Sequence, residues 1–306
     1  MSMYDLVGDI HGHADALESL LAKLGYVERN GVYRHESRKL IFLGDFIDRG
    51  PKISRVLQIA HRMVEEQAAL AILGNHEVNA LAYQTPDPST PDGFIRPHTS
   101  KNMHQHSATL EQLTSDELQK YLGWFRSLPL WIELDGLRVV HACWDDQCIS
   151  KLHHELQFTS HINDSLIERM CSRHGDLFDA VDVICKGKEA DLPAGLTMTD
   201  KDGNVRYRFR TRWYLSPNGL SYQDYAFEPN LVKTEDPLDS GIVDYARPYP
   251  LNERPVFVGH YWLRSESPSL LASNVACLDY SVAKDGFLCA YRWDGEMELN
   301  AANFVW

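Results

Sequence analysis

The chain has 306 residues, 44% of them hydrophobic and 24% charged, which is an ordinary composition for a globular protein. Its formal net charge of −13 argues against a protein that tracks nucleic-acid backbones. No apolar run approaches the roughly 18 residues of a membrane span, and the first residues lack the basic and apolar regions of a signal peptide. We therefore expect a cytoplasmic protein without a membrane partner. Its six cysteines form no Cys-x-x-Cys pair and are expected to be reduced.

The first third of the chain alternates between predicted strands and helices. Apolar runs predict strands and helical spacing of apolar residues predicts helices: strands at 3–8, 39–43 and 68–73, and helices at 14–24, 51–67 and about 75–83. Asn30-Gly31 predicts a hairpin turn within residues 26–33. This order is typical of a mainly parallel sheet with helices on its faces, so the predicted fold class is α/β.

The rest of the chain has weaker periodicity. The predicted elements are a helix at 109–126 with Thr114 or Ser115 as a possible cap, a hairpin at 131–140 around Asp135-Gly136, helical pieces at 151–158, 163–173 and 176–184, a turn at 201–204, and strands at 255–258, 276–280, 287–293 and 296–299. The last of these strands predict an antiparallel finish. We interpret residues 1–306 as a single domain, in which residues from about 145 to 250 form a cap or insert.

Five segments share one pattern, in which an apolar strand ends and residues of metal-ligand type follow. They are Gly8-Asp9-Ile10-His11-Gly12, Gly44-Asp45 with Asp48-Arg49-Gly50, Gly74-Asn75-His76-Glu77, Val139-Val140-His141 and Val258-Gly259-His260. Glycine allows the backbone to turn sharply and to approach an ion closely. In open α/β sheets, ligands bind at the carboxyl ends of the strands. Any one segment alone is better explained as a turn or a helix cap, but five together predict a metal site.

The candidate ligands offer carboxylate, amide and imidazole groups and no thiolate. They are Asp9, His11, Asp45, Asn75, His141 and His260. Such a mixed set suits manganese, iron or zinc. Two-metal hydrolytic centres hold the ions roughly 3.5–4 Å apart, and Asp45, which is central in the order and directly follows a strand, is the candidate for a shared carboxylate.

These motifs resemble those of the calcineurin-like metallophosphoesterases of the phosphoprotein phosphatase type, in the bacterial branch related to symmetrical bis(5'-nucleosyl)-tetraphosphatases. The family pattern is Gly-Asp-x-His-Gly, Gly-Asp-x-x-Asp-Arg-Gly and Gly-Asn-His-Glu, followed by two later histidines. It stands here at residues 8–12, 44–50 and 74–77, with His141 and His260. The resemblance implies a two-sheet β-sandwich flanked by helices, in four layers (α-β-β-α).

The resemblance also implies two divalent metal ions, for which manganese is favoured and iron or zinc are alternatives. Asp9 and His11 would bind the first ion, and Asp45 would bridge both. The ligands of the second ion would be Asn75, His141 and His260.

Three further residues receive catalytic roles from the resemblance. His76 would protonate the leaving oxygen, Asp48 would orient and charge His76, and Arg49 would bind phosphate oxygens together with Asn75. A second phosphate-binding arginine is expected because Arg206, Arg208, Arg210 and Arg212 alternate and so share one face of a strand. Thr211-Arg212 resembles a segment of the tetraphosphatases, so Arg212 is predicted in preference to Arg210. Five other histidines are expected to lie outside the site: His104, His106, His153, His154 and His161.

The predicted function is a metal-dependent phosphatase that hydrolyses phosphomonoesters, of the serine/threonine protein phosphatase type, by in-line attack of a hydroxide held by two metals. Gly259-His260-Tyr261-Trp262 lacks the second histidine of the Gly-His-x-His found in many family members, which weakens a phosphodiesterase assignment. The alternative is a symmetrical dinucleoside tetraphosphatase that hydrolyses a phosphoanhydride, and a remote alternative is a non-catalytic binding scaffold. The expected partner is a phosphorylated substrate: a phosphoprotein, a nucleotide or a small phosphoester.

Overall fold

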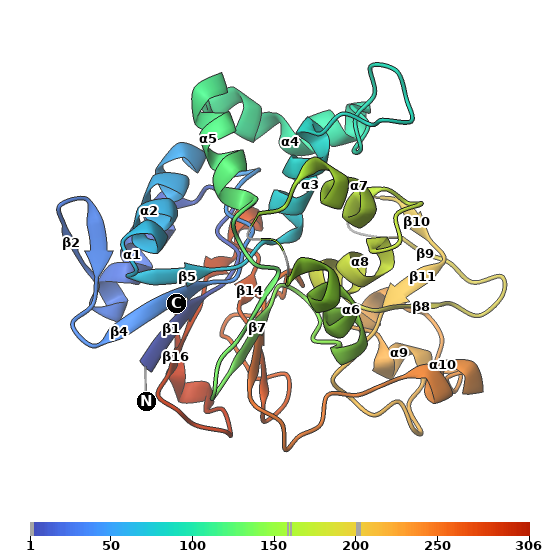
Figure 1. Ribbon diagram of the computed structural model, residues 1–306. Coiled ribbons are helices and arrows are strands. Elements are labelled where there is room, and N and C mark those ends of the chain that lie inside the picture. Colours follow the sequence, from blue (N-terminus) through green and yellow to red (C-terminus); the bar gives the residue numbers. More distant parts are fainter. Residues whose placement is uncertain (1–2, 158, 160, 200–202) are drawn as a thin grey trace.

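In the computed structural model, two β-sheets lie face to face between two groups of helices (Figure 1). The structure describes residues 3–157, 159, 161–199 and 203–306. The first sheet has five strands in the order β17-β16-β1-β4-β5, and the second has four in the order β13-β12-β7-β6. Helices α1 and α2 lie beside the first sheet, and α6 and α8 lie beside the second (Figure 1). The predicted α/β fold with two sheets flanked by helices is confirmed.

The first sheet is mixed. β1 (Met3–Val7) pairs in parallel with β4 (Arg38–Phe42), which pairs in parallel with β5 (Ala69–Ala71). β16 (Ala290–Trp293) runs antiparallel to β1, and β17 (Phe304–Val305) runs antiparallel to β16. The parallel part therefore comes from the predicted strand–helix alternation, and the antiparallel edge comes from the end of the chain.

The second sheet is also mixed. β12 (Val256–Val258) lies between β7 (Arg138–Val140) and β13 (Val275–Cys277) and is parallel to both. β6 (Trp131–Glu133) runs antiparallel to β7, as the predicted hairpin requires. Four small antiparallel pairs of described strands lie outside the main sheets. Two of them are β2 (Val27–Arg29) with β3 (Val32–Arg34) and β14 (Asp279–Tyr280) with β15 (Phe287–Leu288).

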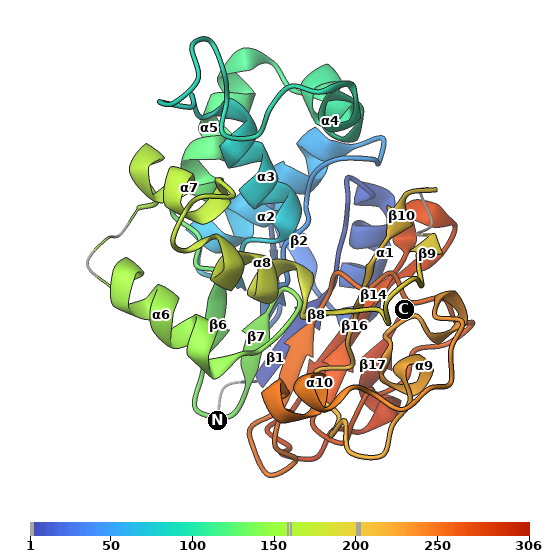
Figure 2. The same cartoon turned by 90° about the vertical axis from the view of Figure 1, so that its right-hand side faces the viewer.

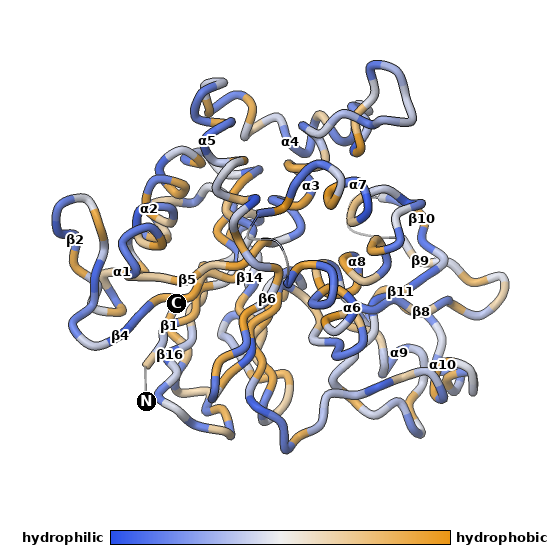
Figure 3. Tube along the Cα trace, viewed as in Figure 1, coloured by the Kyte–Doolittle hydropathy of each residue, from blue (hydrophilic) through white to orange (hydrophobic). Residues whose placement is uncertain are grey.

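The alternation of side chains along the strands divides the apolar core. Leu6 and Ile41 belong to a cluster between the sheets, together with Phe257 of the second sheet. Their chain neighbours Val7 and Phe42 belong to a larger cluster that includes the inner faces of the helices. Figure 3 shows the strands of both sheets as the hydrophobic centre of the molecule. Because both faces of the central strands are buried, their sequences are continuous apolar runs.

Five helices come from the first 125 residues: α1 (Ala14–Leu24), α2 (Ile53–Glu65), α3 (Asn75–Gln84), α4 (Ser100–Gln112) and α5 (Ser115–Phe125). The segment predicted as one helix at 109–126 is divided between the end of α4 and α5, and Thr114, one of the two predicted caps, is the N-cap of α5. The Thr114 hydroxyl accepts a hydrogen bond from the Glu117 amide, and the Glu117 carboxylate accepts one from the Thr114 amide. This capping box starts a new helix inside the predicted one.

The strand predicted at 296–299 is also wrong, since these residues form no strand. The Glu296 carboxylate accepts hydrogen bonds from the Asp294 amide and the Tyr291 hydroxyl. These bonds fold the segment back on β16, so it cannot extend along a neighbouring strand.

Residues 145–250 contain mostly short elements on one side of the second sheet (Figure 2). They are α6 (Asp146–Leu156), α7 (Asp164–Cys171), α8 (Phe178–Lys186), β8 (Glu189–Asp191) paired with β11 (Arg208–Arg210), β9 (Met198–Thr199) paired with β10 (Val205–Arg206), α9 (Tyr222–Tyr225), α10 (Ser240–Tyr245) and the 3-10 turn η1 (Pro229–Leu231). Two further 3-10 turns are η2 (Val282–Lys284) and η3 (Ala301–Asn303). The predicted turn at 201–204 lies partly outside the described residues. That this region is a cap stays a prediction.

Among the described residues, no helix combines the length and apolar character that crossing a bilayer requires. All six cysteines are free thiols, as expected.

Candidate metal centre

The five polar strand ends converge at one place in the fold. Asp9 and His11 follow β1, Asp45 follows β4, and Asn75 is the first residue of α3, the helix that follows β5. His141 and His260 follow β7 and β12 of the second sheet. All six side chains are buried or nearly so, and the fold brings them to the same edge of the sandwich.

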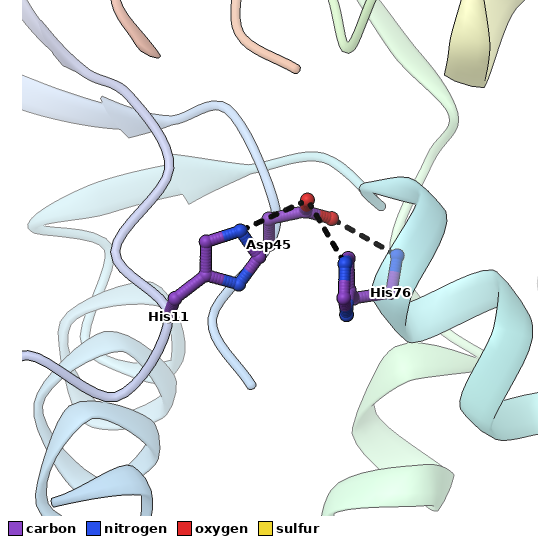
Figure 4. Close-up of side chains that lie close together, drawn as sticks. All are labelled: His11, Asp45 and His76. Carbon is purple, nitrogen blue, oxygen red and sulfur yellow. Dashed lines mark hydrogen bonds and ion pairs between the residues drawn. The ribbon is translucent and has the colours of Figure 1, made fainter. Parts of the chain in front are cut away.

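Asp45 is the centre of this cluster. It belongs to two groups of potential metal ligands, one with His11 and His76 and one with Asp9 and His141. Its Oδ2 lies 3.5 Å from His11 Nε2 and 3.9 Å from His76 Nε2, and its Oδ1 lies 3.4 Å from His141 Nε2. Figure 4 shows His11 and His76 on opposite sides of the Asp45 carboxylate. The two oxygens of one carboxylate thus face two different sets of ligands.

The backbone around these side chains is strained. His11, Asp45, Asp48, Arg49 and His260 all have positive φ, between 44° and 72°. Non-glycine residues adopt this conformation only when the surrounding structure enforces it, and such residues cluster at functional sites. Gly44, with φ of 90°, permits the close approach of two strand ends, since a Cβ there would lie 2.2 Å from the Gly74 amide nitrogen.

The hydrogen bonds of the histidines show that the cluster fits cations. His11 Nδ1 donates to the Ile47 carbonyl at 2.9 Å, and His141 Nδ1 donates to the Leu43 carbonyl at 2.7 Å. In the neutral imidazoles, both Nε2 atoms then present lone pairs toward the oxygens of Asp45. Backbone carbonyls fix the ring orientation of metal-binding histidines in this way.

Two further atoms support the fit. Asp9 Oδ1 and His260 Nε2 are buried and make no hydrogen bond within the described residues. The Asn75 Oδ1 atom lies 3.1 Å from His141 Nε2 and 2.7 Å from His260 Nδ1. The two unpartnered buried atoms, beside the Nε2 lone pairs of His11 and His141, form an environment that suits a bound cation.

The charge imbalance also appears in the pKa values. Burial alone would lower the pKa of the His141 imidazole, but the carboxylates of Asp45 and Asp9 raise it to about 10. Burial and the neighbouring Asp279 carboxylate raise the pKa of Asp9 well above its usual value. Both shifts express the same excess of buried negative charge, which a divalent cation would neutralise.

His76 and Asp48 form a close pair beside the cluster. His76 Nδ1 donates to Asp48 Oδ2 at 2.6 Å, and the His76 amide donates to Asp45 Oδ1 at 2.9 Å. Although burial opposes ionisation, hydrogen bonds from His106 and His76 hold the pKa of Asp48 below its usual value. Asp48 is therefore a carboxylate that orients the ring, whose Nε2 faces the cluster.

Arg49 lies over the cluster from the same loop. Its Nη2 is 3.2 Å from His76 Nε2, and its guanidinium carbon is 3.8 Å from the centre of the Trp262 ring. The indole packs against one face of the guanidinium and so limits its directions. Trp262 stands where many family members have the second histidine of Gly-His-x-His.

The Glu77 carboxylate holds the two strand ends together. It accepts hydrogen bonds from the amides of Asp45, Phe46 and Gly74 at 2.8–2.9 Å. Burial and the nearby Asp45 carboxylate raise the pKa of Glu77 to about 7. Glu77 is thus a structural member of the Gly-Asn-His-Glu motif, since its oxygens are occupied by backbone amides.

A cleft of about 1020 Å³ opens beside the cluster, and Asn75, His76 and His260 line its inner end. Arg206 of β10 and Arg208 and Arg210 of β11 also line it, but Arg212 is not among the lining residues, so the four arginines do not share one face of a single strand. β11 ends at Arg210, and Thr211 then bridges to Ala226. Phosphate binding by Arg212 stays a prediction, and the cleft favours Arg210.

Two residues beside Asp48 were missed by the sequence reasoning. His106, which was expected outside the site, donates from Nδ1 to Asp48 Oδ1 at 2.8 Å. The Thr109 hydroxyl donates to the same oxygen at 2.6 Å. His106 and Thr109 are three residues apart, a spacing that places two side chains on one face of a helix. This signal could have been used only if α4 had been predicted, and the predicted helix covers only its last residues.

Curated relatives with similar sequences are asymmetrical bis(5'-nucleosyl)-tetraphosphatases named PrpE. The one from Oceanobacillus iheyensis is 45% identical over 150 residues, which cover 48% of this chain and 58% of the relative. The one from Bacillus subtilis is 35% identical over 149 residues, which cover 45% of this chain and 57% of the relative. The chain therefore matches under three fifths of the length of these relatives.

Solved structures of phosphatases share the fold. A protein serine/threonine phosphatase from Saccharomyces cerevisiae has a TM-score of 0.50 at 12% identity, over 99% of this chain and 78% of that chain. A cold-active protein tyrosine phosphatase has a TM-score of 0.50 at 19% identity, over 95% of this chain and 75% of that chain. The family model described as calcineurin-like phosphoesterase matches residues 4–185, more than half of the chain. The protein therefore belongs to the calcineurin-like phosphoesterases, a family of metal-dependent hydrolases of phosphoric esters.

Proposed function

We propose that the protein hydrolyses a phosphoanhydride bond of a dinucleoside polyphosphate, with two divalent metals bound around Asp45. The observation that carries the proposal is the charge of the cleft. Among the described residues, nine Lys and Arg and only three carboxylates line it, on a chain whose formal net charge is −13. The basic residues are Arg49, Arg96, Lys101, Arg173, Lys186, Arg206, Arg208, Arg210 and Lys284.

Such a cleft suits a ligand with several negative charges. A local excess of cations reverses the field of an acidic protein and raises the local concentration of anionic substrates. A single phosphoryl group needs only the cations near Arg49, whereas a polyphosphate chain extends along the cleft to the others. The volume is at the upper end of the roughly 300–1000 Å³ usual for small-molecule sites, which suits a ligand with two nucleosides.

The residues of the cluster divide into two ligand sets. Asp9 and His11 would hold one ion, Asp45 would hold both, and Asn75, His141 and His260 would hold the other. Manganese fits the mixed oxygen and nitrogen donors, and iron and zinc are alternatives. Two bound ions would supply activation of a water molecule for in-line attack and neutralisation of charge on the phosphoryl oxygens.

The protein's own groups would handle the phosphoryl group and the leaving oxygen. The planar guanidinium of Arg49 would bind two phosphoryl oxygens, with Asn75 beside it. Arg210, on the wall of the cleft, would bind a neighbouring phosphate. His76 has one proton committed to Asp48, and a second proton on Nε2 would pass to the leaving phosphate oxygen.

The names of the curated relatives support a phosphoanhydride substrate rather than the phosphomonoester favoured by the sequence. Those names specify asymmetrical cleavage, whereas the sequence resemblance pointed to symmetrical enzymes. We also infer that residues 145–250 act as a cap, since Lys186, Arg206, Arg208 and Arg210 lie in this region and line the cleft.

The experiment is product analysis after incubation with diadenosine tetraphosphate and Mn²⁺. Anion-exchange chromatography would separate ATP plus AMP, the products of off-centre cleavage, from ADP, the product of central cleavage. We expect ATP and AMP, and we expect His76→Asn and Asp45→Asn to release neither at a comparable rate. If the tetraphosphate stays intact while p-nitrophenyl phosphate is hydrolysed, the proposed dinucleoside polyphosphate substrate is wrong. If neither substitution changes the rate, the site is wrong and the scaffold alternative gains.

A further inference from the structure

Helix α4 presents an unusual face to the rest of the molecule. Its only buried side chains are the polar His106 and Thr109, whereas its apolar Met103 and Leu110 are exposed. His106, Thr109 and Gln112 are spaced by three residues and so lie on one side of the helix. The fully buried side chains of the helix are therefore polar, and its apolar contact with the core is limited to the partly buried Ala108.

Among the described residues, the side-chain hydrogen bonds of this face all go to residues 48–53, which are the loop before α2 and the first residue of that helix. The Gln112 amide nitrogen donates to the Gly50 carbonyl and its oxygen accepts from the Ile53 amide, both at 2.8 Å. The Thr109 hydroxyl accepts from the Asp48 amide at 3.0 Å. This loop includes Asp48 and Arg49, whose φ values of 67° and 72° require support from neighbouring structure.

The contacts with the Asp48 side chain are the most specific. Its Oδ1 accepts from His106 Nδ1 at 2.8 Å and from the Thr109 hydroxyl at 2.6 Å. Its Oδ2 accepts from His76 Nδ1 at 2.6 Å. The two oxygens are thus divided between α4 and His76, so two bonds from α4 fix the plane of the carboxylate, and the carboxylate fixes the plane of the imidazole.

The burial of these groups argues against simple packing. Asp48, His106, Thr109 and His76 are each less than a tenth exposed. His106 Nε2 is buried and makes no hydrogen bond within the described part of the chain. An apolar side chain at position 106 would avoid this unpaired nitrogen, but it would leave Asp48 Oδ1 with one donor fewer.

We propose that His106 and Thr109 are positioning residues that hold the Asp48 carboxylate against His76. The inference rests on the proposed function, in which His76 passes a proton to the leaving oxygen. α4 would then control how well that proton is delivered, while touching neither the metals nor the reacting phosphorus. Gln112, on the same face, holds the same loop through Gly50 and Ile53 and not through the Asp48 carboxylate.

The first test is kinetic and compares leaving groups. The substitutions Thr109→Val and His106→Leu remove a donor to Asp48, whereas Thr109→Ser and His106→Asn retain one. The assay measures kcat for two substrates. Phenyl phosphate releases phenolate, a poor leaving group, whereas p-nitrophenyl phosphate releases p-nitrophenolate, which departs with little help from an acid. We expect both donor-removing variants to lower kcat for phenyl phosphate about tenfold or more, to change the p-nitrophenyl rate much less, and to leave both KM values similar.

Two controls separate this role from others. Gln112→Leu weakens the same loop and should lower both rates by the same factor. His76→Asn should give a loss for phenyl phosphate at least as large as that of Thr109→Val. If His76→Asn leaves the ratio of the two rates as in the wild type, the proposed role of His76 fails. If His76→Asn changes the ratio but Thr109→Val and His106→Leu do not, only the positioning inference fails.

The second test does not depend on turnover. In Zn²⁺-loaded protein, the His76 Nδ1 proton should give a far-downfield ¹H NMR signal, assigned by its loss in His76→Asn. We expect Thr109→Val to shift or broaden this signal and Thr109→Ser and Gln112→Leu to retain it. An unchanged signal in Thr109→Val would overturn the proposal. If His106→Leu does not fold, the Val and Ser variants at position 109 decide the question alone.

Discussion

Asp45 is the residue on which both ligand groups depend. Each of its carboxylate oxygens faces a different histidine, and its φ of 52° shows that the strand end is bent to place it there. Its amide is held by Glu77 at 2.8 Å, which fixes the backbone. Because the Asp45 carboxylate is buried beside other acceptor atoms, bound cations are needed to offset its negative charge.

The first prediction concerns this shared carboxylate. Asp45→Asn keeps the shape of the side chain but removes the charge that would hold both ions. We expect turnover to fall by about a hundredfold or more, together with weaker binding of Mn²⁺. Isothermal titration calorimetry and turnover of diadenosine tetraphosphate measure the two effects. Unchanged Mn²⁺ affinity in the variant would contradict the assignment of Asp45.

The second prediction compares two arginines of one segment. Arg210 lines the cleft, and its charge is close enough to add to burial in lowering the pKa of His260. Arg212 is not among the lining residues. Arg210→Gln should lower kcat/KM for diadenosine tetraphosphate about tenfold to a hundredfold, the value of a charged hydrogen bond, and Arg212→Gln should change it less than threefold. The reverse order would restore Arg212 as the phosphate ligand.

At the scale of elements, the start of α6 joins the second sheet to the 145–250 region. The Asp145 carboxylate accepts from the Cys148 amide at 2.8 Å, which caps the helix, and lies 2.6 Å from Lys188 Nζ. Lys188 follows α8, so one carboxylate ties two helices of the region together. Asp145 thus provides both the N-cap of α6 and the ion pair with Lys188, and two different substitutions can separate these contributions.

The third prediction uses that separation. Asp145→Ala should lower the free energy of unfolding by about 1 kcal/mol or more, because it removes the cap. Asp145→Asn retains a capping oxygen and should lose only the ion pair with Lys188. Urea unfolding of both variants at neutral pH measures the difference. Equal losses of unfolding free energy in the two variants would show that the helix N-cap contributes nothing to stability.

The stability difference between the wild type and Asp145→Asn should depend on pH with a definite sign. Burial alone would raise the pKa of Asp145, but the bond from Lys188 holds it below its usual value. The unfolded chain therefore takes up a proton there more readily than the folded protein. The extra stability of the wild type over Asp145→Asn should be present above about pH 4 and decline as the pH falls further. Urea unfolding at several pH values measures this decline.

At the scale of the whole molecule, an acidic protein presents a basic cleft. The cations come from the α3–α4 segment, from the 145–250 region and from η2, as Lys101, Arg206 and Lys284 illustrate. No single element supplies the positive field, so the fold as a whole produces it. A field of this kind weakens as salt screens it.

The fourth prediction follows from this screening. Raising NaCl from about 0.05 M to about 0.5 M shortens the Debye length severalfold. The value of kcat/KM should fall more steeply for diadenosine tetraphosphate than for p-nitrophenyl phosphate, which has fewer charges. Initial rates at several salt concentrations, with the Mn²⁺ concentration held constant, measure the two slopes. Parallel slopes would mean that the outer cations of the cleft do not meet the substrate.

The sequence predicted the parts of the fold that depend on local signals. Strand ends such as Gly44-Asp45 combine an apolar run with a ligand, and both are readable from neighbouring residues. The contact of His106 with Asp48 depends on how α4 docks, 58 residues further along the chain. Likewise, the alternation of arginines predicted a shared face, but it could not show that β11 ends at Arg210.

The central claim is that this metal-dependent site prefers a phosphoanhydride in a dinucleoside polyphosphate. The most direct measurement is a competition in one vessel, with equal concentrations of diadenosine tetraphosphate and a phosphoserine peptide, Mn²⁺ and limiting protein. Timed samples are quenched with EDTA and followed by ³¹P NMR. We predict that the tetraphosphate signals convert to those of shorter nucleotides while the peptide signal persists. Release of inorganic phosphate from the peptide, with the tetraphosphate intact, would contradict the account.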